Sequence, residues 1–342
     1  MIRCGVVGAT GYTGIELIKI LLRHSGVNLT ELTTRKTQPF SVRTLVPGLP
    51  EDIGLQVRPF SFDRIKRNVD VAFLCLPHTE AMSTAARLRR AGKTVIDLSA
   101  DFRIKSPNVY EKWYQKKHRA VHLLKEAVYG LPELNRKHIQ KADLIANPGC
   151  YPTGAILGIA PLLGKDLIER ESIIIDSKSG VSGAGRKPTT ATQFCEVNEN
   201  FYAYRVNRHQ HTPEIEQVLS DVAGNGVRVN FVPHLLPVQR GILSTIYLDL
   251  KKKVRANVIK EAYKEAYAAE PFVRVRGENV FPALADVRGT NFCDIGYNVD
   301  LRAGRVIVIT AIDNLIKGAS GQAVQNMNIR MGFEEDEGLR TW

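Results

Sequence analysis

The chain has 342 residues, more than one hydrophobic core usually accommodates, so we expect two domains. Hydrophobic residues make up 44% and charged residues 24%, and no apolar run approaches the ~18 residues of a membrane span. The net charge of +12 fits a solvated basic surface or an anionic partner, but no nucleic-acid-binding motif accompanies it. We therefore expect no membrane and no nucleic acid among the partners.

The cysteines indicate free thiols. The chain has five, at widely separated positions, with no CxxC pair and no zinc-type Cys/His spacing: Cys4, Cys75, Cys150, Cys195 and Cys293. This usage is typical of a reducing compartment and predicts no metal site. The first residues enter a strand directly, without the segments of a signal peptide, so we expect a cytoplasmic protein. All cysteines except Cys150 are expected to be packing residues.

Strands and helices alternate over the first 150 residues. The apolar run 69–78 is typical of a parallel strand buried on both faces. The helix expected to follow this strand ends at Gly92. The pattern predicts a doubly wound, Rossmann-type parallel sheet. Its strands are expected at 2–9, 28–34, 69–78, 94–101 and 143–149, and helices at 14–25 and 79–92.

The pattern changes after Cys150. A helix at 153–165 precedes longer strands with few helices between them, which predicts an α+β domain with a large mixed sheet. Its strands are expected at 172–179, 228–238, 241–250, 292–301 and 305–313, with a helix at 256–270. The final helix, 320–333, is expected to return to the first domain. The predicted domains are 1–149 with 319–342, which binds cofactor, and 150–318, for catalysis and oligomerisation.

The stretch "GVVGATGYTG" places three glycines at G-x-x-G-x-x-G spacing between a strand and a helix. Glycines allow a tight turn and let backbone N–H groups approach a pyrophosphate, which the helix N-terminus also favours. The alternative is a glycine-rich turn with no ligand. At the start of a parallel βαβ unit the motif favours a dinucleotide site. Its predicted residues are Gly8, Thr10, Gly11, Tyr12, Thr13 and Gly14.

The end of the second strand distinguishes between cofactors. An NAD site usually has an acidic residue there, but this strand ends "ELTTRK", with Thr34 and Arg35 at its tip. Hydroxyls and a cation suit a 2′-phosphate, which favours NADP(H). The alternative is an ordinary basic loop. Ser99, which follows a later parallel strand, is expected at the same cofactor edge.

Cys150 lies in "NPGCYPT", between a predicted strand and a predicted helix. A helix N-terminus lowers the pKa of a thiol, and Pro152 is tolerated in a first turn. A thiolate there can form a thioester with an acyl substrate. The residues alone leave two interpretations open, a packed filler or a nucleophile.

The whole chain resembles the N-acetyl-gamma-glutamyl-phosphate reductase family, within the aspartate-semialdehyde dehydrogenase superfamily. Nine motifs in order carry the resemblance: "GATGYTG", "FLCLPH", "VIDLSADFR", "YGLPEL", "NPGCYPT", "SGVSGAGR", "HQHTPEIEQ", "FVPHLLPVQRGI" and "DNLIKGASGQAVQN". The resemblance implies a Rossmann domain joined to a glyceraldehyde-phosphate-dehydrogenase-like domain. It also implies NADPH-dependent reduction of an acyl phosphate to a semialdehyde in arginine biosynthesis, by a homodimer or homotetramer with Cys150 as nucleophile.

The motif "HQHTPEIEQ" places His209 and His211 before a helix start, with Thr212 as the expected N-cap. A histidine has a pKa near working pH, so one of the pair can take the cysteine proton and later protonate the oxyanion. The sequence does not distinguish the two. The alternative is a pair of exposed histidines at a helix entry.

Further residues are expected to contact substrate or cofactor. The Gly- and Ser-rich "SKSGVSGAGR" can bind phosphate through backbone N–H groups and hydroxyls, unless it is a flexible surface loop. In "PVQRGI", Gln239 and Arg240 either orient a carboxylate or acyl group or simply end a strand. Asn314 and Gly318 are expected near the nicotinamide. The predicted substrate-binding residues are Ser182, Gly183, Arg186, Arg103 and Glu214.

The predicted reaction begins with attack of the Cys150 thiolate on the acyl phosphate of N-acetyl-gamma-glutamyl phosphate. One alternative keeps this chemistry but takes an aminoadipyl or glutamyl phosphate carried by a small acidic protein, which the basic chain would attract. A second alternative is a non-catalytic NADP-binding sensor. The sequence does not decide between free and carrier-bound substrate, or between dimer and tetramer.

Overall fold

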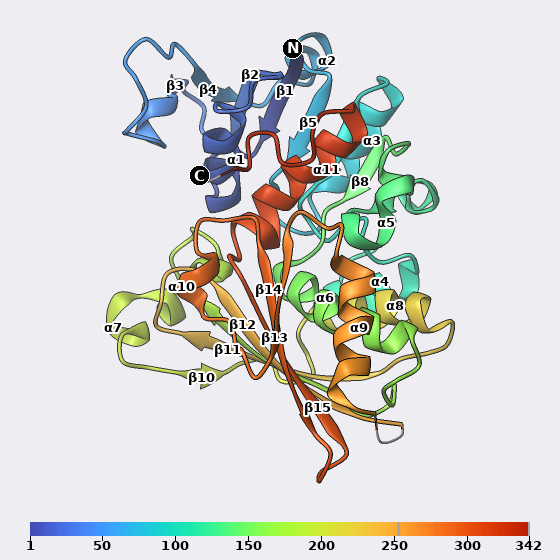
Figure 1. Cartoon of the computed structure of the whole chain (residues 1–342). Coiled ribbons are helices and arrows are strands. Elements are labelled where there is room, and N and C mark those ends of the chain that lie inside the picture. The colour runs from blue at the N-terminus through green and yellow to red at the C-terminus, as the bar shows by residue number, and fades with distance from the viewer. Residues whose placement is uncertain (252–253, 341–342) are drawn as a thin grey trace. The chain divides into compact units, whose positions relative to one another are not determined.

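The computed structural model describes residues 1–251 and 254–340; Lys252, Lys253, Thr341 and Trp342 lie outside it, including the last two residues of the predicted range 319–342. The chain divides into two compact units (Figure 1). The first consists of Met1–Pro148 and the described residues from Ala319 onward, and the second is Gly149–Gly318.

The first unit is built on an eight-stranded sheet in the order β3-β4-β2-β1-β5-β6-β8-β7. Its ladders are parallel except between β3 and β4. The predicted doubly wound sheet is therefore confirmed. The strands are β1 (Ile2–Val7), β2 (Val27–Thr34), β3 (Phe40–Ser41), β4 (Gln56–Pro59), β5 (Val71–Leu74), β6 (Thr94–Asp97), β7 (Val128–Tyr129) and β8 (Leu144–Ala146).

Helices pack on this sheet. Gly92 has φ +71° and follows α3, as expected for a residue that ends a helix. The late helix α11 packs on α1 and α5, so the end of the described chain belongs to this unit (Figure 1). The helices are α1 (Tyr12–Leu21), η1 (Val42–Thr44), α2 (Phe62–Asn68), α3 (Ala81–Arg90), α4 (Pro107–Tyr114), η2 (Val121–Lys125), α5 (Pro132–Ile139) and α11 (Gly321–Met331).

The second unit contains a seven-stranded mixed sheet in the order β10-β11-β9-β12-β15-β14-β13. β9 and β11 are parallel, as are β13 and β14, and the remaining ladders are antiparallel. The predicted mixed sheet is confirmed. The strands are β9 (Ile173–Gly180), β10 (Tyr202–Ala203), β11 (Val229–Leu236), β12 (Ile242–Asp249), β13 (Val273–Glu278), β14 (Cys293–Asp300) and β15 (Arg305–Ile312).

In the second unit, α6 contacts both α8 and α9, and all three helices contact the sheet (Figure 1). The π-helix η5 begins soon after β15 and contains Gly318, the last residue of this unit, so its final two residues belong to the first unit. The helices are α6 (Cys150–Gly164), η3 (Val181–Ala184), η4 (Thr190–Thr192), α7 (Phe194–Val197), α8 (Thr212–Ala223), α9 (Ala256–Tyr267), α10 (Leu284–Val287) and η5 (Ile316–Ser320).

Helix α6 is buried almost throughout and close to β15. A Cβ added at Gly158 would lie 2.8 Å from Thr310 Cγ2, so a larger residue would push the helix away from the strand. Pro161 within α6 has no N–H to bond to the carbonyl of Leu157. The Tyr267 hydroxyl donates to that carbonyl at 2.6 Å instead, and Tyr263 donates to Gly158 O at 2.6 Å.

The structure refines several predicted boundaries. α6 begins at Cys150 itself, three residues before the predicted helix start. Sequence periodicity missed the short strands β3, β4, β7 and β10, because two to four residues give no readable alternation. Among residues 1–251 and 254–340, no helix has the length and apolarity needed to cross a membrane.

Candidate active site

The glycine-rich loop of the first unit joins β1 to α1. Gly8 has φ +91°, and a Cβ there would lie 2.4 Å from the carbonyl oxygen of Cys75. A Cβ at Gly14 would lie 2.7 Å from Gly8 O. Both positions therefore require glycine, one for its backbone conformation and both for close approach.

The loop fits the pyrophosphate of a dinucleotide. A Cβ built at Gly11 meets no described atom closer than 4.0 Å, so the backbone there is open to a ligand. Gly11 is the N-cap of α1 and supplies no side-chain cap for the first N–H groups of the helix. Such uncapped N–H groups and the helix dipole favour a bound phosphate. Thr10 and Thr13 flank this opening, half-buried, and Tyr12 is exposed.

The tip of β2 carries the predicted discriminating residues. Thr34 is buried, and its hydroxyl accepts a hydrogen bond from the Lys36 backbone N–H at 3.2 Å. Arg35 is exposed and forms an ion pair with Glu80. The cation predicted for a 2′-phosphate is thus present at the strand end, with a carboxylate beside it.

The segment after β6 is a buried polar turn. Ser99 is 1% exposed, and its hydroxyl donates to Asp97 Oδ2 at 2.7 Å. The Asp101 carboxylate accepts the backbone N–H groups of Thr79 and Ala81. Burial, with a smaller contribution from Asp101, raises the pKa of Asp97 to about 7. Ser99 therefore shapes the turn from inside the unit.

Arg103 is also an interior residue. It is 5% exposed; its Nε donates to Asn147 O at 2.7 Å and its Nη2 to Leu98 O at 2.8 Å. These carbonyls follow β8 and β6, so the guanidinium joins two neighbouring strand ends. Both of these hydrogen bonds are internal to the unit, and the predicted contact of Arg103 with substrate stays a prediction.

In the second unit, Cys150 is the first residue of α6 and is half-buried. Gly149, the N-cap residue, provides no side chain. A Cβ at Gly318 would lie 2.8 Å from Cys150 Cβ, so the π-helix η5 is pressed against the nucleophile position. Gly318, predicted as a cofactor residue, is thereby a direct neighbour of the thiol within this unit.

Glu214 lies beneath the start of α6. It is fully buried, and its Oε1 accepts the Gly149 backbone N–H at 2.7 Å. Because α8 carries Glu214 and α6 carries Cys150, this bond fixes one helix start relative to the other. This bond supports the start of the Cys150 helix, and the predicted contact of Glu214 with substrate stays a prediction.

The two histidines lie at the start of α8. His211, rather than Thr212, is the N-cap residue, a shift of one position. The backbone N–H of His211 donates to His209 Nδ1 at 3.2 Å. His209 is 9% exposed, and its ring packs edge-on against Tyr151, Tyr204 and Phe231.

Tyr151 and Tyr204 were missed by sequence reasoning, although Tyr151 directly follows Cys150. Their hydroxyl oxygens lie 2.9 Å apart. The pKa of Tyr204 is raised to about 12, mainly by burial, and burial raises the pKa of Tyr151 further. A negative charge at Cys150 contributes to both shifts, so both phenols lie within the electrostatic reach of the thiol and stay protonated near neutral pH.

The predicted phosphate loop lies at the end of β9. Ser182 is buried, and its hydroxyl accepts from Asn314 Nδ2 at 3.0 Å. Asn314 Oδ1 accepts the Gly241 N–H at 2.7 Å, so this predicted cofactor residue joins two turns of the catalytic unit. Gly183 and Arg186 are exposed.

The other cysteines divide into two kinds. Cys4 and Cys293 are buried and Cys75 is half-buried, consistent with packing. Burial raises the pKa of Cys4 to about 12 and that of Cys75 still higher. Cys195 is exposed on the short helix α7, so its predicted packing role was wrong. The burial of a four-residue helix depends on its neighbours and not on its own pattern.

The comparisons with known proteins agree with both halves of this arrangement. Residues 3–142 match the semialdehyde dehydrogenase NAD binding domain, and residues 150–314 match the semialdehyde dehydrogenase dimerisation domain. Solved structures share the fold at low identity. An aspartate semialdehyde dehydrogenase II from Vibrio cholerae has a TM-score of 0.72 at 18% identity, with 97% of this chain and 98% of that chain covered. One from Candida albicans, solved with NADP, has a TM-score of 0.73 at 17% identity, with 96% and 98% covered. The class is that of the semialdehyde dehydrogenases.

Relatives at higher identity narrow this class. N-acetyl-gamma-glutamyl-phosphate reductase from Pelotomaculum thermopropionicum is 53% identical over 99% of this chain and 97% of its own length. The enzyme of the same name from Desulfotalea psychrophila is 50% identical over 99% and 98%. The chain belongs to the N-acetyl-gamma-glutamyl-phosphate reductase family.

This membership confirms the resemblance found in the sequence and the prediction of an oxidoreductase enzyme with a nicotinamide-dinucleotide domain. It leaves no support for a non-catalytic sensor, since the relatives are named as reductases. The role of each site residue stays a prediction.

Proposed function

We propose that the chain reduces N-acetyl-gamma-glutamyl phosphate to N-acetylglutamate semialdehyde and phosphate, with NADPH as reductant, in arginine biosynthesis. The first unit binds the dinucleotide and the second carries out the chemistry. The observation that supports this most directly is the half-buried Cys150 at the first position of α6, with the side-chain-free Gly318 against it. A helix N-terminus stabilises a thiolate, and the missing side chain of Gly318 lets its backbone approach Cys150 closely.

The reaction proceeds through an acyl-enzyme. The Cys150 thiolate attacks the acyl carbon, a C–S bond forms, and the C–O bond to phosphate breaks, giving a thioester and inorganic phosphate. The dinucleotide, when bound, supplies a hydride to the thioester carbon. The resulting thiohemiacetal collapses to the aldehyde and regenerates the thiolate. Water must stay away from the thioester until reduction, because hydrolysis would waste it.

We assign the proton transfers to His211 and a positioning role to His209. His209 is enclosed by three aromatic rings, and its Nδ1 accepts the His211 backbone N–H. His211 is half-buried at the open start of α8. An acid or base must reach the reacting atoms, which favours the less enclosed ring. His211→Asn should flatten the pH dependence of turnover. His209→Asn should lower turnover at every pH without changing the shape of the pH profile.

The second unit also offers a surface for assembly as a homodimer or homotetramer. Alternate residues of its central strands are partly exposed on one face, including Ile174, Leu243 and Tyr247. This face is mixed, since Asp176 and Lys178 lie beside Ile174 on it, and burial of its apolar part against a second copy would stabilise a homodimer. Light scattering across a dilution series measures the stoichiometry.

A substrate panel tests the proposed function. The purified chain is supplied with N-acetyl-gamma-glutamyl phosphate, generated in the assay, and with NADPH or NADH in parallel. We expect turnover of the free acyl phosphate with preference for NADPH. Absence of turnover with both cofactors would contradict the proposal.

The same panel includes an acyl phosphate carried by a small acidic protein. The net charge of +12 motivates this second candidate, since opposite charge raises association rates. Turnover confined to the carried substrate, and falling steeply with salt, would favour it over the free acyl phosphate.

A further inference from the structure

The turn between β11 and β12 carries Arg240, which the reaction above leaves without a role. The backbone of this turn lies against the predicted phosphate loop. Ser182 N–H donates to Gln239 O at 3.1 Å, and a Cβ at Gly180 would lie 2.8 Å from the Arg240 backbone nitrogen. Arg240 thus stands at the end of the sheet where β9 ends and β12 begins.

Asp313, directly after β15, holds this end together. It is fully buried, and Oδ2 lies 3.3 Å from Arg240 Nε. Its carboxylate also accepts the backbone N–H groups of Leu315 at 2.8 Å and Ile316 at 3.2 Å, and its carbonyl accepts Gly318 N–H at 2.9 Å. One residue therefore orients Arg240 and shapes the turn that presses Gly318 against Cys150.

Asp313 receives a third N–H from outside this turn. Gly289 N–H donates to Oδ2 at 2.7 Å, and Gly289 has φ +79°, a conformation that favours glycine. The carboxylate is therefore surrounded by three backbone donors and one guanidinium. Such a set stabilises a buried negative charge and fixes its position.

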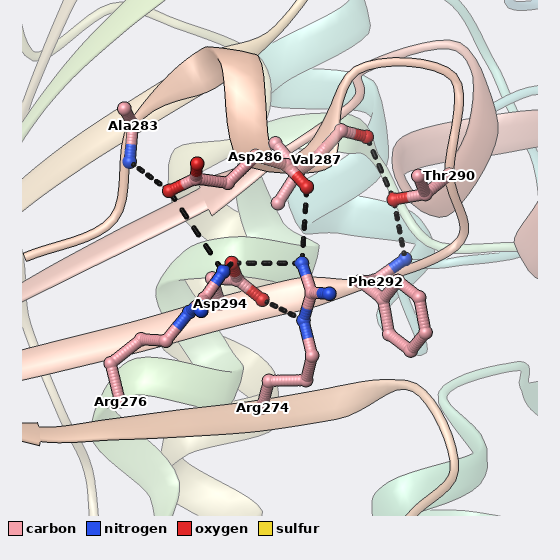
Figure 2. Close-up of polar contacts among 8 residues, drawn as sticks. All are labelled: Arg274, Arg276, Ala283, Asp286, Val287, Thr290, Phe292 and Asp294. Atoms are coloured by element: carbon pink, nitrogen blue, oxygen red, sulfur yellow. Dashed lines mark hydrogen bonds and ion pairs between the residues drawn. The ribbon is translucent and has the colours of Figure 1, made fainter.

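The segment that contains Gly289 is held in place by further polar contacts (Figure 2). Two arginines of β13 donate hydrogen bonds to the fully buried Asp294, Arg274 through Nε at 2.6 Å and Arg276 through Nη2 at 2.6 Å. Arg274 Nη2 also donates to the carbonyl of Asp286 in α10 at 3.1 Å, as Figure 2 shows. Thr290 accepts Phe292 N–H at 3.3 Å and donates to Val287 O at 2.8 Å. Together these bonds anchor both sides of Gly289.

The geometry assigns Arg240 as a specificity-determining residue. We propose that its guanidinium binds the free carboxylate of the acyl-phosphate substrate, with Asp313 as the positioning residue. A guanidinium presents a planar fork that matches a carboxylate, and fixing Nε on one side orients that fork. Arg240 keeps 17% of its side chain exposed, so it reaches the surface of this unit, unlike the buried Asp313.

The charges at this end of the sheet fit separate sites for the phosphoryl group and the carboxylate of the substrate. The loop around Ser182 and Gly183 offers backbone N–H groups and hydroxyls, which suit a phosphate. Arg240 adds a cation on the neighbouring turn, where the preceding residue, Gln239, accepts a hydrogen bond from the Ser182 N–H. A substrate with a carboxylate and a phosphoryl group then meets a separate group for each. This inference rests on the proposed function, because it concerns the substrate of that site.

The experiment compares two aldehydes in the reverse reaction, measured as phosphate-dependent NADP reduction. One is N-acetylglutamate semialdehyde, and the other is its carboxamide, which lacks only the negative charge. The variants are Arg240→Met, Arg240→Lys and Asp313→Asn. The matched controls are Arg305→Met and Asp249→Asn, because these residues form an exposed ion pair at the opposite end of the same β12–β15 ladder.

We expect the wild-type chain to prefer the carboxylate, and Arg240→Met to reduce that preference about 10- to 100-fold, as for a lost charged hydrogen bond. Arg240→Lys should restore part of it, since the charge remains without the fork. Asp313→Asn should reduce the preference less and also lower kcat, because Gly318 shifts. The controls should keep wild-type ratios, and dinucleotide binding should stay intact in every variant.

Two outcomes overturn the assignment. An unchanged carboxylate-to-carboxamide ratio in Arg240→Met shows that the guanidinium does not bind the carboxylate. A raised KM for phosphate with an unchanged ratio shows that it binds the phosphoryl group instead. Failure of the wild-type chain to turn over either aldehyde would contradict the proposed function itself, which separates the two failures.

Discussion

The two units build their candidate sites in opposite ways. In the first, seven consecutive residues from Gly8 to Gly14 form the loop, and their backbone does the work. In the second, Cys150, His211 and Arg240 come from segments far apart in the chain, and the site depends on their side chains. A backbone site depends on the absence of side chains, and a catalytic site depends on tertiary placement. Substitutions should therefore affect the two halves separately.

The largest effect is expected from Cys150→Ser. A serine hydroxyl at the start of α6 is not ionised near neutral pH, so turnover should fall on the order of 10⁴-fold. Dinucleotide affinity should not change, since that loop lies in the other unit. Steady-state kinetics and fluorescence titration with NADPH measure the two properties.

Cys195→Ser is the matched control, because that thiol is exposed and is not part of the proposed site. It should leave turnover unchanged. In its background, alkylation at pH 8 should modify Cys150 alone, since burial raises the pKa of Cys4 and Cys75, and added substrate should slow that modification. Near-wild-type turnover of Cys150→Ser would refute the thioester mechanism.

The converse effect is expected from Gly14→Ala. Its added Cβ would lie 2.7 Å from Gly8 O and 2.8 Å from Ala9 Cα, so the loop must move. We expect dinucleotide affinity to fall at least about 100-fold, because backbone N–H groups lose their alignment. Alkylation of Cys150 should proceed at the wild-type rate. Gly54→Ala serves as control, since nothing lies within 4 Å of its added Cβ.

A third prediction concerns the polar turn that supports the cofactor half. The pKa of Asp97 is about 7 in the folded state, compared with 3.8 for an aspartate in an unfolded chain. The folded chain therefore keeps this proton at pH values where the unfolded chain has lost it. The unfolded chain binds fewer protons across this window, so this group contributes stability at low pH that is lost as pH rises toward 7. Between pH 5 and pH 6.5, Asp97→Asn should gain about 2 kcal/mol in free energy of unfolding relative to wild type.

Urea denaturation of both proteins at each pH measures this difference. The comparison with the variant is needed because the pKa of His78 is lowered to about 4 by burial, which gives wild type an opposite pH dependence. A constant difference across the window would show that Asp97 is already ionised in the folded chain.

The smallest effects are expected at the tip of β2. Arg35→Ala should reduce the preference for NADPH over NADH about tenfold, because a 2′-phosphate loses its cation. Glu80→Gln should do the reverse and lower the KM for NADPH a few-fold, since it removes the carboxylate that pairs with Arg35. Initial rates with both cofactors report the ratio. Equal ratios in all three proteins would remove Arg35 from the cofactor site.

The sequence predicted well what is local. The glycine loop, Cys150 at a helix start and the switch from a parallel to a mixed sheet all follow from neighbouring residues. Residue type alone did not show which polar side chains turn inward. Ser99, Arg103 and Glu214 resemble ligand-binding residues in the sequence, yet each is at least nine-tenths buried and bonds to its own unit.

The residues that sequence reasoning missed share one property. Tyr204, Asp313 and Gly289 each depend on at least one partner distant in the chain. A spacing rule has no access to such pairs, because the separation between partners is set by the whole fold. Tyr151 was within reach, since a helix that begins at Cys150 places the next residue at the same site.

The proline in α6 has a consequence for how far disturbances travel. Because Pro161 has no N–H to donate to the Leu157 carbonyl, that carbonyl accepts the Tyr267 hydroxyl of α9. The helix that carries Cys150 is therefore hydrogen-bonded to α9 near its middle and to Glu214 at its start. Hydrogen bonds at its start and its middle restrict sliding and rotation of the helix. Substitutions in α9 that remove this hydrogen bond, such as at Tyr267, should therefore alter the position of the Cys150 sulfur atom.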